Sequence, residues 1–289
     1  MPYLYLVASV ICMSTSSVFG SFYNRKNLGR KDTSPLYNFL QLITVCVGWW
    51  VLFLMDFSFD PTVLLYALGF GACYTVCTIS LINALKTGPI TLTSLFSQLS
   101  LIAVTIWGFI FWDEPISPIV IVGLVLVVVA ITLCLYKGKE ANAKGFSWKW
   151  LIFAVLAFAG NAGCTIIQNT QQMVFEEKHG NMLMAFATLI SMIVCAVVFF
   201  RSDKNDAKLI AKTSWFFPVL AGAFNIVLNV CVMKMATSTI PASLRFPVLA
   251  VGGLTITTFF SVLVFKERLK WWQWVGFVLG VISVVLLSI

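Results

Sequence analysis

Long apolar stretches dominate the chain and are separated by short polar connections. A helix needs about 20 mostly apolar residues to cross the hydrocarbon core of a bilayer. Ten stretches approach this length, and one of them is interrupted by a single charge, Arg245. Strands of a membrane barrel would instead alternate apolar and polar residues over about 10 positions. The pattern predicts an all-α integral membrane bundle of ten transmembrane helices, at residues 4–22, 36–55, 63–85, 89–112, 116–136, 150–175, 182–200, 215–233, 240–265 and 269–289.

The second half of the chain repeats the pattern of the first. Aligning Glu114 with Glu267 also brings Gly123 onto Gly276, and the longest connection, 137–149, lies between the halves. We therefore predict two five-helix repeats, residues 1–140 and 141–289, that act as one unit. Because each repeat holds an odd number of helices, the second is inverted relative to the first, as in many secondary transporters.

The basic residues predict an orientation. Of the 19 Lys and Arg residues, all but Lys178, Lys234 and Arg245 lie in the odd-numbered connections. Such connections face the cytoplasm, so both termini are predicted outside. The net charge of +8 does not indicate nucleic-acid binding, because the basic residues cluster between apolar stretches and do not line one helix face.

Composition excludes several classes of protein. The chain is 60% hydrophobic and 10% charged, whereas soluble domains carry about a quarter charged residues. All eight cysteines fall in apolar stretches without a CxxC pair, which favours packing over disulfides or metal ligands. One histidine, no acid within an apolar stretch and no GxxxxGK[ST] loop argue against an enzyme, a cofactor or an ATP-driven pump.

Short motifs recur at the ends of both halves. They are Phe111-Trp112-Asp113-Glu114 leading to Gly123, Val264-Phe265-Lys266-Glu267-Arg268 leading to Gly276, and the runs Ala84 to Pro89 and Met235 to Pro241. With these motifs the chain resembles the EamA-type branch of the drug/metabolite transporter superfamily over essentially its whole length. The resemblance implies a central cavity walled by helices one to four and six to nine, with alternating access. Several members are described with both termini in the cytoplasm, opposite to the orientation that the charges predict here.

Polar side chains within the apolar stretches indicate where a site would lie. They are costly in hydrocarbon unless they meet a partner or a wet cavity, and residues three or four apart share a helix face. The alternative is that they hydrogen-bond between helices and only hold the bundle together. We expect substrate-binding residues at Gln41, Tyr74, Gln98, Asn161, Asn225 and Asn229, with Trp107 closing the cavity.

Arg245 is the strongest single signal. It lies about one turn into the ninth helix between Pro241 and Pro247, and prolines leave carbonyls unpaired, as in broken transporter helices. We hypothesise that Arg245 binds a carboxylate or phosphate of the substrate. Alternatively, it snorkels to outer headgroups. Glu114 and Glu267 are expected to be helix-end or gating groups.

No carboxylate lies in the middle of an apolar stretch, which argues against proton exchange. The prediction is a facilitator or exchanger in the plasma membrane for a small polar metabolite such as an amino acid or organic anion. A scaffold or receptor with the same fold, and a drug or quaternary-amine exporter, remain alternatives. The expected partners are the solute and the lipid bilayer, with a monomer or a weak homodimer through the tenth helix.

Overall fold

The structure, a computed structural model, describes residues 2–27, 30, 33–87, 90–114, 116–136, 147–201, 206–265 and 270–287. Within these residues the chain forms eleven helices and no strand. The helices are α1 (Pro2–Lys26), α2 (Thr33–Met55), α3 (Val63–Thr87), α4 (Ile90–Phe111), α5 (Pro118–Leu135), α6 (Trp148–Val174), α7 (Gly180–Arg201), α8 (Ala207–Ser214), α9 (Phe216–Met235), α10 (Ala242–Phe265) and α11 (Trp271–Leu287).

Each predicted stretch coincides with a helix to within a few residues, and the short helix α8 is the addition. Ile210 on α8 is fully buried and packs with Tyr23 and Phe199, while Lys208 and Lys212 are exposed. An apolar face of one or two turns is too short to stand out in a search for spanning helices. The sequence pattern therefore placed this segment in a connection.

Seven helices are long and apolar enough to cross a membrane, namely α1, α2, α3, α6, α7, α9 and α10. Three shorter apolar helices are found at Leu95–Phe111, Pro118–Cys134 and Trp271–Leu287, within α4, α5 and α11. The prediction of ten spanning helices is thus met by length and composition at seven of them. Val122 and Val125 on α5, and Val278 and Val281 on α11, are exposed, as expected for helix faces in contact with lipid.

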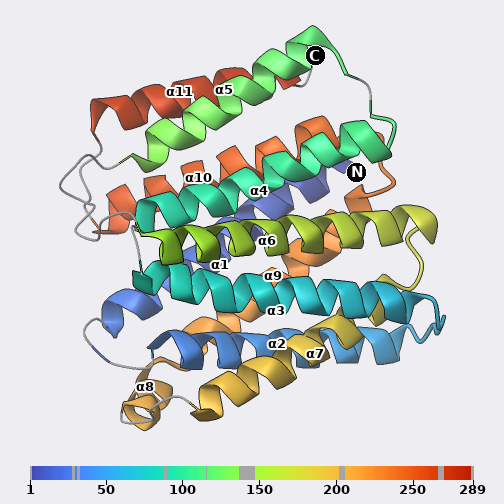
Figure 1. Ribbon diagram of the computed structural model, residues 1–289, viewed down its shortest axis with the longest axis vertical. Coiled ribbons are helices and arrows are strands. Elements are labelled where there is room, and N and C mark those ends of the chain that lie inside the picture. The colour runs from blue at the N-terminus through green and yellow to red at the C-terminus, as the bar shows by residue number, and fades with distance from the viewer. Residues whose placement is uncertain are drawn as a thin grey trace.

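The ten long helices lie side by side, and consecutive ones run in opposite directions (Figure 1). Both termini lie toward the same end of the bundle, which we call the terminal end. The opposite end carries α8 and the connection between α1 and α2, and we call it the α8 end. The helix ends that flank the predicted cytoplasmic connections lie at the α8 end.

Contacts between the two halves of the chain are symmetric. α1 packs on α9 and α3 packs on α6, which are equivalent pairs once the five long helices of each half are matched in order. The pairs α2 with α7, α4 with α10, and α5 with α11 are their own counterparts. Figure 1 shows α5 and α11 as a separate pair along one edge of the bundle. The halves therefore interlock across a shared centre.

Glycines allow the closest helix approaches. A Cβ added at Gly160 of α6 would lie 2.7 Å from the Cys73 carbonyl oxygen of α3. One added at Gly276 of α11 would lie 2.9 Å from the Ala130 carbonyl oxygen of α5. Small residues permit such backbone contact between membrane helices. Since Gly276 and Gly280 pack against α5 and α10 of the same chain, a homodimer through α11 would have to use another face of that helix.

The eight cysteines are free thiols, and six of them are buried. Two serines fix helix starts near the middle of the chain. The Ser117 hydroxyl accepts a hydrogen bond from the Val120 N–H at the start of α5, and the Ser147 hydroxyl accepts one from the Trp150 N–H at the start of α6. Such side-chain caps satisfy N–H groups that a helix leaves unpaired in its first turn. Ser147 thus defines where α6 begins after the midpoint connection, and Ser117 defines where α5 begins after α4.

Candidate functional site

A cavity of about 410 Å³ lies between the two halves of the bundle. Its volume falls in the range of about 300–1,000 Å³ that is typical of small-molecule sites. The lining residues come from α1, α2, α3, α4, α6, α7, α9 and α10, and none comes from α5 or α11. Its polar lining consists of Ser16, Ser17, Tyr74, Ser97, Gln98, Asn161, Thr165, Gln168, Thr188, Asn225 and Asn229, and its apolar lining includes Met13, Phe70, Met184 and Phe246.

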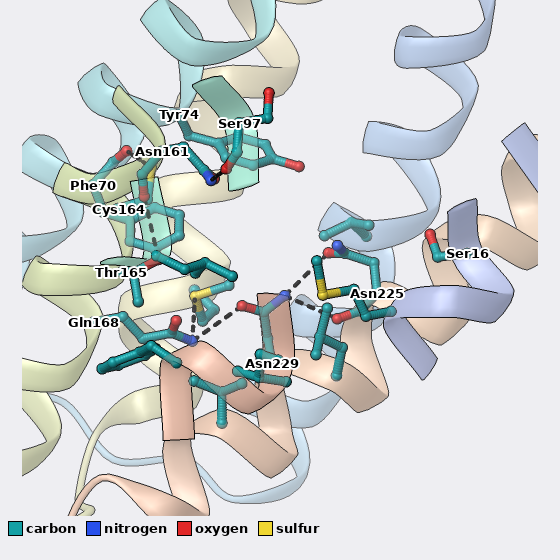
Figure 2. A pocket seen from close by; sticks show the side chains of 18 of the residues that line it. Ser16, Phe70, Tyr74, Ser97, Asn161, Cys164, Thr165, Gln168, Asn225 and Asn229 are labelled. Atoms are coloured by element: carbon teal, nitrogen blue, oxygen red, sulfur yellow. Dashed lines mark hydrogen bonds between the residues drawn. The ribbon is translucent and has the colours of Figure 1, made fainter. Parts of the chain in front are cut away.

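One wall of the cavity carries a row of three amides on α6 and α9 (Figure 2). Gln168 Nε2 donates to Asn229 Oδ1 at 3.2 Å, and Asn229 Nδ2 donates to Asn225 Oδ1 at 3.1 Å. Residues 225 and 229 are one turn apart, so α9 presents both on one face. Each amide donates to the next, and the row therefore has a single direction from α6 to α9.

The other wall is formed by α3, α4 and part of α6. Figure 2 shows Tyr74, Ser97 and Asn161 close together there. Asn161 Nδ2 donates to Ser100 Oγ at 2.6 Å. Gln98 also lines this side, and its Oε1 is buried without a hydrogen-bond partner. Because buried polar atoms are normally paired, this oxygen requires an explanation.

Five of the predicted substrate-binding residues line the cavity, namely Tyr74, Gln98, Asn161, Asn225 and Asn229. The prediction also missed residues, including Thr165, which lies one turn from Asn161 on α6. The spacing of three or four residues along α6 was the available signal. A threonine is common in membrane helices, however, because its hydroxyl can bond to its own backbone, as Thr165 does to the Asn161 carbonyl at 3.2 Å.

Gln41 and Trp107 are not among the lining residues. Gln41 lies one turn from the lining residue Val45 on α2, toward the α8 end. Trp107 is 37% exposed and stacks on Phe111 with ring centroids 4.0 Å apart. Nine residues, or about two and a half turns, separate Trp107 from Gln98, so the two point to opposite sides of α4. The expectation that Trp107 closes the cavity is wrong for this reason.

Arg245 is also absent from the cavity lining. It is 3% exposed, and its NH1 donates to the Met235 carbonyl at 2.6 Å and to Asn169 Oδ1 at 3.4 Å. Met235 is the last residue of α9, and a cation at a helix C-terminus is favoured by the unpaired carbonyls and the helix dipole. The NH1 group is thus bonded within the protein, while Arg245 Nε is buried without a hydrogen-bond partner in the described residues. Since Arg245 does not line the cavity, the structure gives no support to a substrate contact.

The two prolines predicted a broken helix around Arg245, but the helix is continuous there. α10 runs without interruption from Ala242 to Phe265 and includes Pro247. Pro241 precedes its first residue, and the Pro241 carbonyl accepts hydrogen bonds from the Leu244 and Arg245 N–H groups. A proline costs little at a helix start, where its missing N–H would have no partner in the helix.

Glu114 occupies a helix end, at the junction of α4 and α10. Its Oε1 accepts a hydrogen bond from the Ala242 N–H, the first residue of α10, at 2.8 Å. A carboxylate is favoured at a helix N-terminus, and its charge also favours the nearby Arg245 cation. Its repeat counterpart, Glu267, lies outside the described residues.

Polar groups, some buried and some exposed, connect the helices at the terminal end of the bundle. Gln171 Nε2 donates to the Lys178 carbonyl at 3.0 Å, and Lys234 pairs with Glu177 at 3.2 Å. The Thr237 hydroxyl also donates to Glu177. These groups connect α6, α9 and the start of α10. We call this set the polar cluster, and its members are Asn169, Gln171, Gln172, Glu177, Lys234 and Arg245.

Aromatic rings occupy the α8 end. Phe22 stacks on Phe217 with centroids 6.0 Å apart and meets Phe260 edge-on at 5.7 Å. Phe19 stacks on Phe224 at 5.9 Å. All five rings are half-buried. We call them the aromatic cluster, and they join α1, α9 and α10 near the cavity.

An all-helical bundle with apolar outer faces and a central cavity lined by apolar side chains, amides and hydroxyls is typical of a multi-pass membrane protein of the transporter type. The model of the EamA-like transporter family matches residues 1–136 and again 148–289, and the chain belongs to that family. Membership of this family makes it a membrane transporter of small molecules.

A solved structure titled only "Crystal structure of protein" shares this fold. It has a TM-score of 0.73 and 12% identity, with 99% of this chain and 95% of that chain covered. No curated protein matches the chain.

Proposed function

We propose that the chain carries a small polar solute across the plasma membrane by alternating access, as a facilitator or exchanger. The observation that carries the proposal is the cavity between the interlocked halves, lined by eight helices. None of its lining residues in the described part of the chain is Asp, Glu, His, Lys or Arg. Proton-coupled carriers depend on ionisable groups within the membrane, so this lining favours transport without proton exchange.

The two ends of the cavity differ in a way that supports alternating access. Toward the terminal end, Gln168, Met184 and Phe246 are at most 3% exposed. Toward the α8 end, Leu81 and Asn225 are only half-buried. This is the arrangement of a carrier closed on one side. With the α8 end in the cytoplasm, as the loop charges predict, the open side faces inward.

Solute counterflow in vesicles tests the proposal. Vesicles containing the purified protein are loaded with one unlabelled solute, and uptake of the labelled solute is followed with and without an imposed pH gradient. We expect uptake that is accelerated by internal solute and unchanged by the gradient. Uptake that requires the gradient contradicts the uncoupled mechanism. Solute binding without any flux would instead favour a receptor or scaffold.

Orientation is tested by labelling with a membrane-impermeant thiol reagent in intact cells. Lys208 on α8 and Phe57 between α2 and α3 are both exposed and lie at opposite ends of the bundle. We expect Phe57→Cys to be labelled and Lys208→Cys to be labelled only after lysis. The reverse result would place both termini in the cytoplasm.

A further inference from the structure

The cavity combines many hydrogen-bonding groups with no formal charge. Its lining in the described residues offers amides and hydroxyls, while the nearest buried cation, Arg245, is bonded to Met235 and Asn169. A net charge that leaves water needs a counter-charge, and without one its burial is strongly unfavourable. The cavity therefore favours a ligand that is uncharged and rich in hydrogen-bonding groups.

Gln98 supplies an acceptor that the protein does not use. Its Oε1 is buried, lines the cavity and has no hydrogen-bond partner. An unmet buried acceptor is unfavourable until a donor reaches it. An N–H or O–H group of a bound ligand would satisfy this oxygen.

The amide row on the facing wall supplies the complementary groups. Asn229 lies between Gln168 and Asn225 and already donates to Asn225. Asn229 uses both its oxygen and its NH2 group within the row, which leaves the Gln168 Oε1 acceptor and the Asn225 Nδ2 donor at its two ends for a ligand edge that carries both a donor and an acceptor. Carboxamides, lactams and nucleobases carry such an edge.

The apolar part of the lining favours a flat body behind that edge. Phe70 and Tyr74 stack on one another at 5.9 Å with an interplanar angle of 27°, and Phe246 lines the closed side of the cavity. Aromatic rings pack well against other planar groups. A flat ring placed here keeps its polar edge in reach of the amides.

We propose that the transported solute is an uncharged molecule with a carboxamide or lactam edge on a flat body, and that Gln98 accepts the N–H of that edge. The proposal rests on the transport function proposed above and narrows its substrate class. Under this proposal the preferred ligand is a neutral amide and not the organic anion that the sequence suggested.

Nicotinamide and nicotinate provide a matched pair of ligands, since they share a ring and differ in having a neutral amide or a carboxylate at neutral pH. Thermal unfolding of the purified protein is followed with each of them, with uracil as a lactam and with benzylamine as a cation. We expect stabilisation by nicotinamide and uracil at concentrations where nicotinate and benzylamine give none. Equal or stronger stabilisation by nicotinate or benzylamine, or none by either amide, overturns the proposal.

Gln98→Leu removes the acceptor and should weaken nicotinamide binding about tenfold, the effect of one lost hydrogen bond in a buried site. Gln41→Leu is the matched control, because Gln41 is half-buried in α2 but does not line the cavity, and it should bind as the unchanged protein does. Gln98→Met, which keeps the side-chain length, serves if Gln98→Leu does not fold. Unchanged binding in the Gln98 variant contradicts the role of this residue.

Counterflow separates this proposal from the function on which it rests. If the vesicles exchange another class of solute and no amide binds, the proposed substrate class is wrong and the proposed transport function still holds. If nicotinamide or uracil binds and no solute is exchanged, the proposed transport function is wrong and the proposed ligand class still holds.

Discussion

The helices at the terminal end and at the α8 end of the bundle are held together by opposite kinds of chemistry. At the terminal end, Arg245 and Gln171 are almost fully buried and bond to main-chain carbonyls of Met235 and Lys178. At the α8 end, half-buried rings such as Phe22 and Phe217 pack on one another. Hydrogen bonds are lost when their atoms move by an ångström or two, whereas ring contacts tolerate several geometries. The polar cluster therefore fixes one arrangement, and the aromatic cluster allows its helices to shift.

The same comparison explains where the charge of Arg245 belongs. The sequence shows a cation within an apolar stretch, and an anionic solute is one way to neutralise it. In the structure, the end of α9 and the side chain of Asn169 bind Arg245 in place of a solute, and Glu114 lies nearby. A charge that holds the closed end is expected to affect stability more than ligand selectivity.

Replacing Arg245 with Met should have the largest effect. It removes the bonds to Met235 and Asn169 and leaves Glu114 without its neighbouring cation, and breaking a buried charge arrangement costs about 3–5 kcal/mol. We expect the free energy of unfolding in detergent to fall by about 3 kcal/mol. Lys234→Met is the control at the same end, because Lys234 is 50% exposed and exposed pairs contribute about 0–1 kcal/mol. Equal losses of the free energy of unfolding in the two variants would mean that the burial of Arg245 does not determine how firmly the terminal end is held.

Replacing Phe22 with Leu tests the aromatic cluster. It removes the contacts with Phe217 and Phe260 while keeping an apolar side chain, and aromatic pairs contribute about 0.5–1.5 kcal/mol beyond their buried area. We expect a loss of about 1 kcal/mol in the free energy of unfolding, with counterflow retained. A loss as large as that of Arg245→Met would show that the α8 end is held as firmly as the terminal end.

The turn between α6 and α7 allows a smaller change of opposite sign. Glu176 has a φ of 50°, a left-handed conformation that costs most residues about 1–2 kcal/mol and that glycine adopts freely. Glu176→Gly should therefore raise the free energy of unfolding by up to about 1 kcal/mol. Lys178→Gly, at a neighbouring position without a positive φ, should lower it. Destabilisation by both glycines would argue against strain in this turn.

The smallest effect concerns pH at the terminal end. The Thr62 hydroxyl and N–H donate to the Asp60 carboxylate, and these bonds hold the pKa of Asp60 below 3.8. Since the pKa of Asp60 is lower in the folded state than in the unfolded state, the carboxylate stabilises the fold at pH values above about 3.9, which is the unfolded pKa. That stability is lost as the pH falls through the folded pKa. The melting temperatures of the protein and of Asp60→Asn should differ slightly at pH 6, and the difference should shrink as the pH is lowered below about 3.9. A difference that grows on acidification would contradict this.

Periodicity indicated which of the cavity amides share a helix face. Asn225 and Asn229 stand four residues apart and Asn161 and Gln168 seven, and such spacings place side chains on one helix face whatever the tertiary packing. Trp107 could have been excluded by the same rule, since it lies opposite Gln98 on α4. The hydrophobic pattern likewise fixed the helices to within a few residues, because apolar length determines where a chain can enter lipid.

What the sequence could not provide was the neighbour of each buried group. Nothing near Arg245 in the chain indicates that the last turn of α9 lies beside it, since Met235 becomes its partner only through tertiary packing. Gln41 has the right residue type on the right helix and lies one turn from Val45, outside the cavity lining. α8 was hidden because its buried face is only about two turns long.

The glycine contacts between α5 and α11 have a consequence for motion. Gly276 lies against the Ala130 backbone and Gly123 against the Leu287 side chain, so sliding by one residue would bring a side chain into the space that a glycine leaves open. The α5–α11 pair therefore has no alternative packing at a shifted register, so the distance between the two helices should remain constant through the transport cycle. Spin labels on the lipid-facing positions Val125 and Val281 should accordingly give one narrow distance distribution, with or without solute. They would provide the fixed reference against which movement of the other eight long helices is measured.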